Sequence, residues 1–490
     1  MARTHAHSRP GRHPALRLAL VAIIAGLPLA MTQSSLAQIL PAIKRKDKEP
    51  SKPPQRSGDR NLSPMNVAPP TEPIADKVIQ KIRTRSWLMK VEVRVNAFNE
   101  VDASTGMPAN NTLKFQTAKV VFPKVFSTAG SRFLDELPDR FASRLRLDGA
   151  TKDDEMKLLN TVYPSGARLM GWEATNYQGN GMTLTVEMPI DTWGVQFDEQ
   201  LAYSIPWPAS WPAEASSTFQ PQLGVDHACT NPLPLDEQVK QTNDRINLLI
   251  AEWTQGNDPK SIPPVQLAKF LAGQTLQMLQ ESGDGLAFNR IRPTRTGAGV
   301  ATFQGFDLKG ALKTIEDGRG SEHDIACTLA AIYRKAGLPA RVVIGYDPGF
   351  ADVNKARRSG KKALRSWVEF ALVDPVPNRL FWVPVDIVRQ RNQSSRAPDF
   401  SSKWDFFGNN HELEVILPLS FHYHPPTTVV AHGSPCLWGW LTTPATQMAD
   451  QTVRFDAITL PARSGDRDAR DQAERERTNP SRQPGTQPPP

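Results

Sequence analysis

The segment from Gly318 to Tyr346 constrains the fold of this chain more than any other part of the sequence. A glycine-punctuated turn leads into hydroxyl and acidic side chains at positions 321–324, which suit the first turn of a helix. Small and apolar residues at helical spacing follow, and Gly337 and Pro339 mark the end of that helix. The apolar, β-branched run 342–346 predicts a strand directly afterwards. The segment therefore predicts a turn, a buried helix and a strand, and the helix N-terminus is a suitable position for a functional group.

The length of 490 residues allows two to three domains of about 150 residues each. The 43 prolines cluster, which indicates linkers rather than an unusual fold. We expect a signal peptide over 1–37, a proline-rich disordered linker over 38–85, and a β-rich domain with a Trp-Pro strap over 86–235. A domain around the segment 318–346 is expected over 236–445, and a disordered C-terminal tail over 446–490.

The first 37 residues have the pattern of a secretory signal. Four arginines and no acidic residue precede an apolar run from Leu18 to Ala30, and Ser35-Leu-Ala37 comes before Gln38. A transmembrane anchor is the alternative, but the apolar run is shorter than the ~20 residues that span a bilayer. We therefore expect cleavage and a secreted or periplasmic protein with no membrane span.

The net charge and the number of cysteines limit the possible partners and disulfides of the chain. The net charge of +8 falls to +4 when the four arginines of the signal are removed, and so small a charge does not imply nucleic acid or a membrane surface as a partner. The chain has three cysteines, which are Cys229, Cys327 and Cys436. At most one disulfide can form, and the sequence leaves open whether Cys229 and Cys436 pair.

The β-rich domain is predicted from period-two patterns. Apolar and polar residues alternate from Val91 to Ala97, and further strands are expected over 113–126 and 182–188. Helical inserts are expected over 131–146 and 153–159. No group of catalytic residue types occurs in this domain, so we expect a scaffold or binding module. Two amphipathic helices are then predicted, over 236–253 and 264–280.

Four motifs around the opening segment resemble a known family. They are Gly320-x-Glu322-x-Asp324-Ile-Ala326, Gly337-Leu-Pro-Ala-Arg341, Arg365-Ser-Trp367-Val-Glu369 and Phe381-Trp382-Val-Pro-Val-Asp386. Their order and spacing over residues 300–410 resemble bacterial transglutaminase-like proteins. The resemblance implies a papain-like core with a central helix packed on an antiparallel sheet. We therefore expect an α+β protein in which the β-rich domain precedes a transglutaminase-like core, the domain over 236–445.

The resemblance also assigns the family's catalytic positions. The cysteine position holds Glu322, the histidine position holds Arg365, and the aspartate position is matched by Asp386. A carboxylate cannot form the family's thioester, and a guanidinium that stays protonated cannot act as a general acid or base near neutral pH. We therefore expect a degenerate site that uses no cofactor and to which no catalytic residue can be assigned.

The two substitutions preserve the signs of the charges. A thiolate facing an imidazolium is an ion pair, and a glutamate facing an arginine keeps both charges in place. We therefore expect Glu322, Arg365 and Asp386 to form a charge-assisted network that holds the helix start against two strands.

Two alternative hypotheses assign a catalytic reaction to this region. Cys327 lies four residues after His323, so the two share a helix face and could form a displaced nucleophile and base; the alternative is a small core cysteine with a histidine that caps or rims the helix. Glu322 could instead pair with Asp386 or Asp324 for acid and base catalysis, although a neighbouring arginine opposes the raised pKa that a general acid needs.

Histidines near the C-terminus are weak candidates for a metal site. His422, His424, His432 and Cys436 fall close together in the sequence. His422 and His424 would share one face of a strand, but no paired-ligand motif anchors the set. Unrelated loop and strand histidines are the alternative.

The expected function follows from these features. We expect a non-catalytic envelope protein that binds a peptide, a protein or a cell-wall polymer, and the basic loop 355–362 is a candidate contact for an acidic ligand, with a plain solvated loop as the alternative. The alternative function is a cysteine-dependent peptide hydrolase or acyl-transferase that uses Cys327.

Overall fold

In the computed structural model of the protein, the residues with the period-two pattern near position 90 lie in a long strand, β1 (Ile79–Ala97). Val91, Val93 and Val95 are buried, while Glu92 and Arg94 between them are half-buried and exposed. One face of this strand therefore covers a core.

The structure describes most of the chain after residue 69. The described residues are 70–97, 112–135, 137–152, 157–162, 168–222, 224–226, 233–283, 285–290, 301–350, 363–393, 399–422, 430–432, 438–443 and 449–461. They all belong to one compact unit, residues 62–490.

Two antiparallel sheets form a β-sandwich. The β1 sheet contains β20 (Ala449–Thr459), β1, β9 (Gly181–Phe197), β4 (Ser131–Phe133), β3 (Ser127–Thr128), β5 (Ala142–Leu147) and β6 (Ala150–Thr151). The β2 sheet contains β18 (Val430–His432), β19 (Trp438–Thr443), β2 (Leu113–Lys124), β8 (Arg168–Gly179) and β7 (Lys157–Val162). Buried side chains of both sheets share one apolar core, which includes Val93 from β1, Phe122 from β2 and Trp172 from β8.

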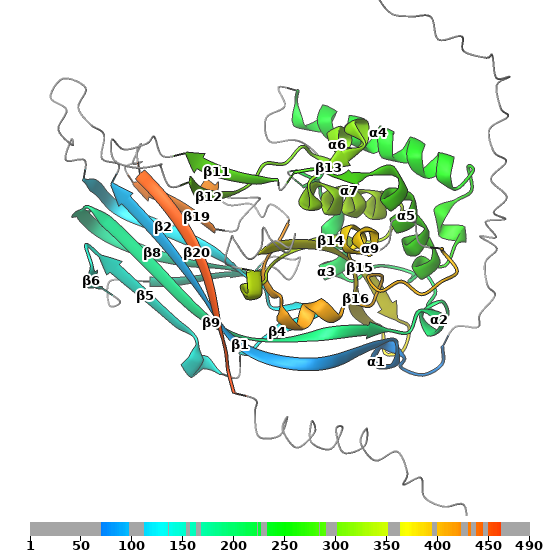
Figure 1. The fold of residues 1–490 in the computed structure, drawn as a ribbon, viewed down its shortest axis with the longest axis horizontal. Coiled ribbons are helices and arrows are strands. Elements are labelled where there is room, and N and C mark those ends of the chain that lie inside the picture. Colours follow the sequence, from blue (N-terminus) through cyan, green and yellow to red (C-terminus); the bar gives the residue numbers. More distant parts are fainter. Residues whose placement is uncertain are drawn as a thin grey trace, which may run out of the picture. The chain divides into compact units, whose positions relative to one another are not determined.

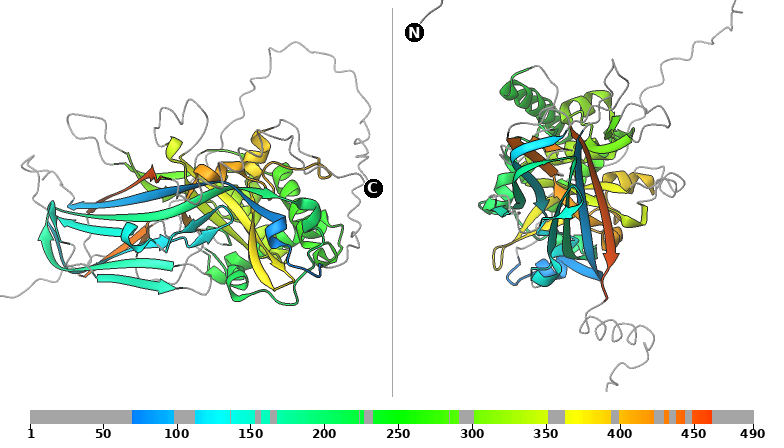
Figure 2. Two further views of the ribbon diagram at one scale, coloured as in Figure 1. Left: turned by 90° about the horizontal axis from the view of Figure 1, so that it is seen from below. Right: turned by 90° about the vertical axis from the view of Figure 1, so that its left-hand side faces the viewer.

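The end of the chain completes this sandwich. β20 pairs along β1 from Trp87 opposite Thr459 to Ala97 opposite Ala449, as the adjacent blue and red strands of Figures 1 and 2 show. β19 pairs with β2. The prediction of a disordered tail from residue 446 is therefore wrong over 449–459, because these residues gain backbone partners on β1 and half-bury Val453 and Phe455.

Three other predictions made from the sequence differ from the structure. The predicted linker over 38–85 is wrong at its end, because α1 (Ala75–Val78) and the start of β1 lie there. β18 and β19, which were assigned to the domain over 236–445, belong to the sandwich. The predicted helical inserts are wrong where the chain is described, because β4 and β5 lie in the first segment and β7 begins at Lys157 in the second.

A second layer is built on a four-stranded antiparallel sheet, here called the core sheet. Its order is β16 (Arg379–Val385), β15 (Leu364–Asp374), β14 (Ala340–Tyr346) and β17 (Leu417–Phe421). The helices are α4 (Leu235–Trp253), α5 (Pro264–Met278), α6 (Ala311–Asp317), α7 (Glu322–Lys335) and α9 (Ile387–Asn392), with the short α2 (Glu199–Ala202) and α3 (Ala213–Ser216). Figure 1 shows α7 beside β14 and β15, with α5 and α6 next to α7. The α+β prediction is confirmed.

The predicted buried helix is α7, and its ends form as the sequence indicates. Gly318 takes the left-handed conformation, with φ +63°, that ends α6. Ser321 caps α7: its Oγ accepts a hydrogen bond from the backbone N–H of Asp324, and the Asp324 carboxylate accepts one from the backbone N–H of Ser321. Residues 322–334 of α7 are all buried against the core sheet and neighbouring helices. This packing fixes the direction in which the first turn of α7 presents its side chains.

The part of the chain that the structure describes contains no helix that is both long enough and apolar enough to cross a membrane.

Candidate functional site

The predicted ion-pair network is present at the start of α7. The Arg365 Nε atom donates to Glu322 Oε1 over 3.0 Å, and Arg365 Nη2 donates to Asp386 Oδ2 over 3.0 Å. The backbone N–H of Ser366 donates to the same Glu322 oxygen over 3.1 Å. The structure therefore brings all three predicted positions into direct contact.

Each member of the network comes from a different element. Glu322 is the first residue of α7, and Arg365 is the second residue of β15. Asp386 follows β16 and caps α9, because its second carboxylate oxygen accepts the backbone N–H of Arg389 over 2.9 Å. The side chains of Glu322, Arg365 and Asp386 are 10%, 6% and 3% exposed, so the network is closed to bulk water.

Two further charged residues extend the network, and sequence reasoning missed both. Glu412, from the 3₁₀ turn His411–Val415, accepts a hydrogen bond from Arg365 Nη1 over 3.3 Å. Arg389 donates two hydrogen bonds to the Glu412 carboxylate, one of them from Nε over 3.0 Å. Three carboxylates thus surround two guanidinium groups.

This excess of carboxylates shapes the protonation of the network. Burial raises the pKa of Asp386 from 3.8 to about 7; the Arg365 charge opposes this rise and the Glu322 charge adds to it. Burial would lower the pKa of Arg365, but the charges of Glu322, Asp386 and Glu412 outweigh it and raise that pKa. The arginine therefore stays a cation, and Asp386 takes up its proton near neutral pH.

The network leaves almost no free space. A cavity of about 10 Å³ lies beside Glu322, Ser366 and Asp386. One water molecule needs at least ~10–15 Å³. Among the described residues, this cavity therefore holds at most about one water molecule.

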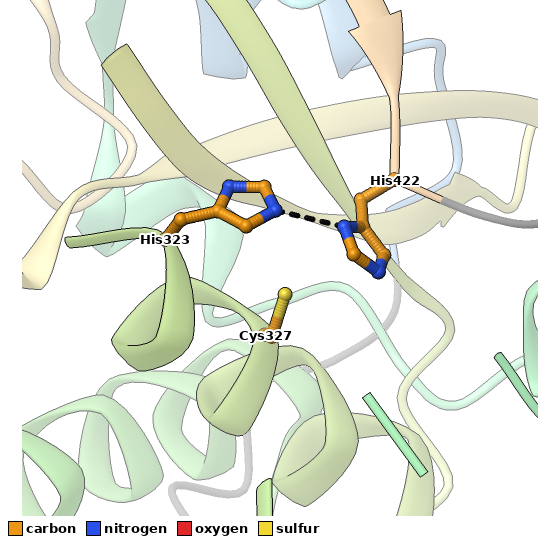
Figure 3. Close-up of side chains that lie close together, drawn as sticks. All are labelled: His323, Cys327 and His422. Atoms are coloured by element: carbon orange, nitrogen blue, oxygen red, sulfur yellow. Dashed lines mark hydrogen bonds between the residues drawn. The ribbon is translucent and has the colours of Figure 1, made fainter. Parts of the chain in front are cut away.

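The residues of the displaced pair lie on the same helix but in a different environment. His323 and Cys327 are 1% and 0% exposed, and His422, which follows β17, joins them with 0% exposure. The Nε2 atom of His323 lies 2.8 Å from Nδ1 of His422, and the Nδ1 atom of His323 lies 2.6 Å from the Ser366 hydroxyl. Figure 3 shows the Cys327 sulfur pointing toward the space between the two rings.

This environment disfavours a reactive thiolate. Burial, followed by the nearby Asp324 charge, raises the pKa of Cys327 well above its ordinary value. Burial, followed by the neighbouring His422, lowers the pKa of His323 well below its ordinary value. His323 does not cap or rim the helix, as one reading had it, because Ser321 caps α7 and the imidazole is enclosed.

Of the predicted C-terminal metal candidates, only His422 has a described side chain. His422 lies with His323 and Cys327, and a ligand atom from each of these three residues lies within 4.8 Å of the other two. His424, Cys436 and Cys229 lie outside the described residues, as does the basic loop 355–362, and the side chain of His432 is not described. Cys327 is a free, buried thiol.

The alternative carboxylate pairing with Asp324 is wrong. Its carboxylate accepts hydrogen bonds from the backbone N–H groups of Ser321 and Lys309, so it is a capping residue. Glu322 and Asp386 do lie together, but Arg365 binds both.

Two of the motifs also meet in a buried ion pair away from the network. Arg341 donates from Nε and Nη2 to Glu369 Oε2 over 2.9 and 2.8 Å. Its guanidinium carbon lies 4.0 Å from the ring centroid of Trp382. Motif residues therefore join β14, β15 and β16 structurally.

Residues 299–387, which span α6, α7 and β14 to β16, match the family described as the transglutaminase-like superfamily. The chain contains a transglutaminase-like core. No curated protein matches the chain.

The chain is only weakly similar to solved structures. A candidate cysteine protease from Cytophaga hutchinsonii is 10% identical with a TM-score of 0.43, over 79% of this chain and 94% of that chain. A candidate protease from Parabacteroides distasonis is 10% identical with a TM-score of 0.18, over 64% of this chain and 63% of that chain. The family assignment therefore depends on residues 299–387.

Proposed function

We propose that this chain is a secreted or periplasmic, non-catalytic protein whose transglutaminase-like core serves as a binding or scaffold module of the cell envelope. The observation that supports this is the ion-pair network of Glu322, Arg365 and Asp386. The resemblance assigns a nucleophilic thiol to position 322 and a base to position 365. A glutamate and a permanently charged arginine cannot supply these two functions.

The burial of Cys327 argues against the alternative of a cysteine hydrolase or acyl-transferase. An attacking thiolate needs a lowered pKa and access to its substrate. Cys327 is fully buried with a raised pKa, and its neighbour His323 is held by Ser366 and His422.

The carboxylates are equally unsuited to glycoside hydrolysis. That chemistry needs two carboxyl groups with room for a sugar between them. Glu322 and Asp386 instead share the Arg365 cation around a cavity of about 10 Å³.

The location and the ligand class come from the sequence. Residues 1–37 carry the signal pattern, and the β-sandwich provides a large domain without a catalytic residue group. The proposed ligands are a peptide, a protein or a cell-wall polymer. Fold alone does not choose among them, because function depends on the site.

Alkylation and activity assays on the purified mature protein test the absence of catalysis. We expect iodoacetamide to modify Cys327 only after denaturation, and a Cys327→Ala variant to match the wild type in peptide hydrolysis and amine-transfer assays. Fast, pH-dependent labelling of native Cys327, together with an activity that Cys327→Ala abolishes, would support the enzyme instead.

Fractionation and pelleting test the location and the ligand. We expect the mature N-terminus at Gln38 outside the cytoplasm, and co-sedimentation with purified peptidoglycan that an inert protein of similar size does not show. A cytoplasmic, uncleaved chain would contradict the location. Failure to bind peptidoglycan, with binding to peptides or envelope proteins, would shift the ligand class.

A further inference from the structure

Three side chains with metal-binding atoms converge inside the transglutaminase-like core. His323 and Cys327 are spaced i, i+4, so they project from the same face of α7, and His422 approaches from the end of β17 (Figure 3). One ligand atom from each residue lies within 4.8 Å of the other two. The three ligand atoms are therefore near enough to surround one ion after side-chain adjustment.

The surroundings hold two of these ligands in place. The Ser366 hydroxyl lies 2.6 Å from His323 Nδ1, which leaves Nε2 facing His422. The backbone N–H of His422 donates to the Val342 carbonyl on β14 over 2.8 Å. Phe306 stacks on the His323 ring with 4.3 Å between centroids. Such outer contacts are typical of metal-binding histidines, whose second ring nitrogen is hydrogen-bonded to a neighbour.

We propose that His323, Cys327 and His422 form a buried binding site for a thiophilic, closed-shell metal ion, Zn²⁺ or Cu⁺. Thiolate and imidazole are the ligands that these ions prefer. The site is separate from the Glu322, Arg365 and Asp386 network, and it goes beyond the proposed function, because a bound ion here would join α7 to the core sheet.

Binding requires the three ligand atoms to adjust their positions around the ion. With zinc–nitrogen distances of about 2.0–2.1 Å and a tetrahedral angle, the two ring nitrogens must separate by about half an ångström from their present 2.8 Å. Cys327 loses its proton to solvent, while both imidazoles stay neutral and bind through lone pairs. The resulting thiolate neutralises a Cu⁺ ion completely and a Zn²⁺ ion by half.

Metal titration of the untagged mature protein tests the site. Under reducing, oxygen-free conditions we expect native mass spectrometry to show one Zn²⁺ or one Cu⁺ per chain, in separate experiments. Co²⁺ in place of Zn²⁺ should give a thiolate-to-metal absorption band in the near ultraviolet. The thermal unfolding midpoint of the wild type should rise when the ion is bound, because only the folded chain assembles the ligands.

Four variants locate the ion. Cys327→Ser should lose the thiolate band, and His422→Gln should lose stoichiometric binding. Ser366→Ala should weaken the affinity about 10- to 100-fold, as outer-shell changes do, without removing the band. His411→Ala is the matched control, because His411 is an exposed histidine outside the cluster, and it should behave as the wild type.

A combined His424→Asn, His432→Asn and Cys436→Ser variant distinguishes the C-terminal set. Retained binding in this variant supports the proposed site. Binding that survives Cys327→Ser but disappears in the combined variant would overturn it, as would a wild type that binds neither ion. If buried substitutions prevent folding, the wild-type stoichiometry and the Ser366→Ala affinity still decide the question. None of these outcomes changes the expected lack of catalysis, which alkylation and activity assays address.

Discussion

The Arg365 guanidinium lies directly against the Glu322 carboxylate, with Nε 3.0 Å from Oε1, and both side chains are at least nine-tenths buried. The partners come from the first residue of a helix and from the second residue of a strand, so the pair fixes how α7 meets the core sheet. Asp386 and Glu412 complete the shell around the same cation. Removing the arginine would leave buried carboxylates without their cation.

Replacing Arg365 with methionine should therefore be strongly destabilising. We expect Arg365→Met to lower the free energy of unfolding by about 3–5 kcal/mol, because breaking a buried pair leaves uncompensated charge. Urea unfolding at neutral pH measures the change. Part of the loss should be recovered at lower pH, where the carboxylates accept protons.

An exposed arginine provides the matched control. Arg379 pairs with Asp76, but their side chains are 48% and 87% exposed. We expect Arg379→Met to cost less than about 1 kcal/mol. Equal losses for Arg365→Met and Arg379→Met would show that the buried network contributes no special stability.

The stability of the protein should depend on the protonation of Asp386. Its pKa in the folded chain is about 7, above the ordinary 3.8, so the folded state binds more protons between these values. Stability from this group should therefore rise as the pH falls from 7 toward 4. Relative to Asp386→Asn, the wild type should gain up to about 1.4 kcal/mol per pH unit.

Urea midpoints of both proteins between pH 5 and 7 test this dependence. This window avoids the titration of Glu412. Burial would raise the pKa of Glu412, but the hydrogen bond from Arg389 and the charge of Arg365 lower it below 4.5. The stability that Glu412 contributes is therefore lost only in more acidic solution. A difference between wild type and Asp386→Asn that stays constant with pH would contradict the raised pKa of Asp386.

Local pattern predicted the helix of the core, and the family resemblance indicated the three network positions, but neither could predict the other distant partners. Ser321 and Gly318 mark the ends of elements within a few residues of themselves, so their roles could be read directly. Glu412 reaches Arg365 from 47 positions away, and no spacing rule connects the two. The sequence pattern singled out His422 but not its contact with His323, which lies 99 positions away on α7.

The same limit explains the C-terminal strand. From Thr452 to Ala457 the residues alternate in polarity, but the neighbouring charges favoured a solvated tail. The decisive contribution comes from β1, more than 350 positions earlier, which supplies the backbone partners that stabilise the strand. A strand that depends on so distant an edge carries little local signal.

Truncation should separate β20 from the residues after it. A chain that ends at Pro461 keeps β20 and should unfold within about 0.5 kcal/mol of the wild type, since it loses none of the described contacts. A chain that ends at Ala445 loses the pairing with β1 and exposes apolar surface that Val453 and Phe455 cover. We expect it to lose roughly 2–4 kcal/mol. Equal stability of the two chains in urea would show that β20 does not contribute to the fold.

Restoring the family's chemistry tests whether the network occupies a degenerate catalytic site. In a Glu322→Cys, Arg365→His double variant, the thiol would lie at the N-terminus of α7, facing an imidazole that Asp386 can orient. Both new side chains are smaller than those they replace, so the closed cavity should open. We expect the new thiol to react with iodoacetamide at least tenfold faster than Cys327, with a pH profile shifted toward acid, because a neighbouring imidazolium lowers a thiol pKa.

Glu322→Cys alone keeps Arg365 and is the matched control. Its thiol should be reactive, but only the double variant should hydrolyse an activated ester, because a guanidinium cannot take up the proton. If the double variant folds and neither labels nor hydrolyses faster than the control, positions 322 and 365 do not retain the geometry of a catalytic pair.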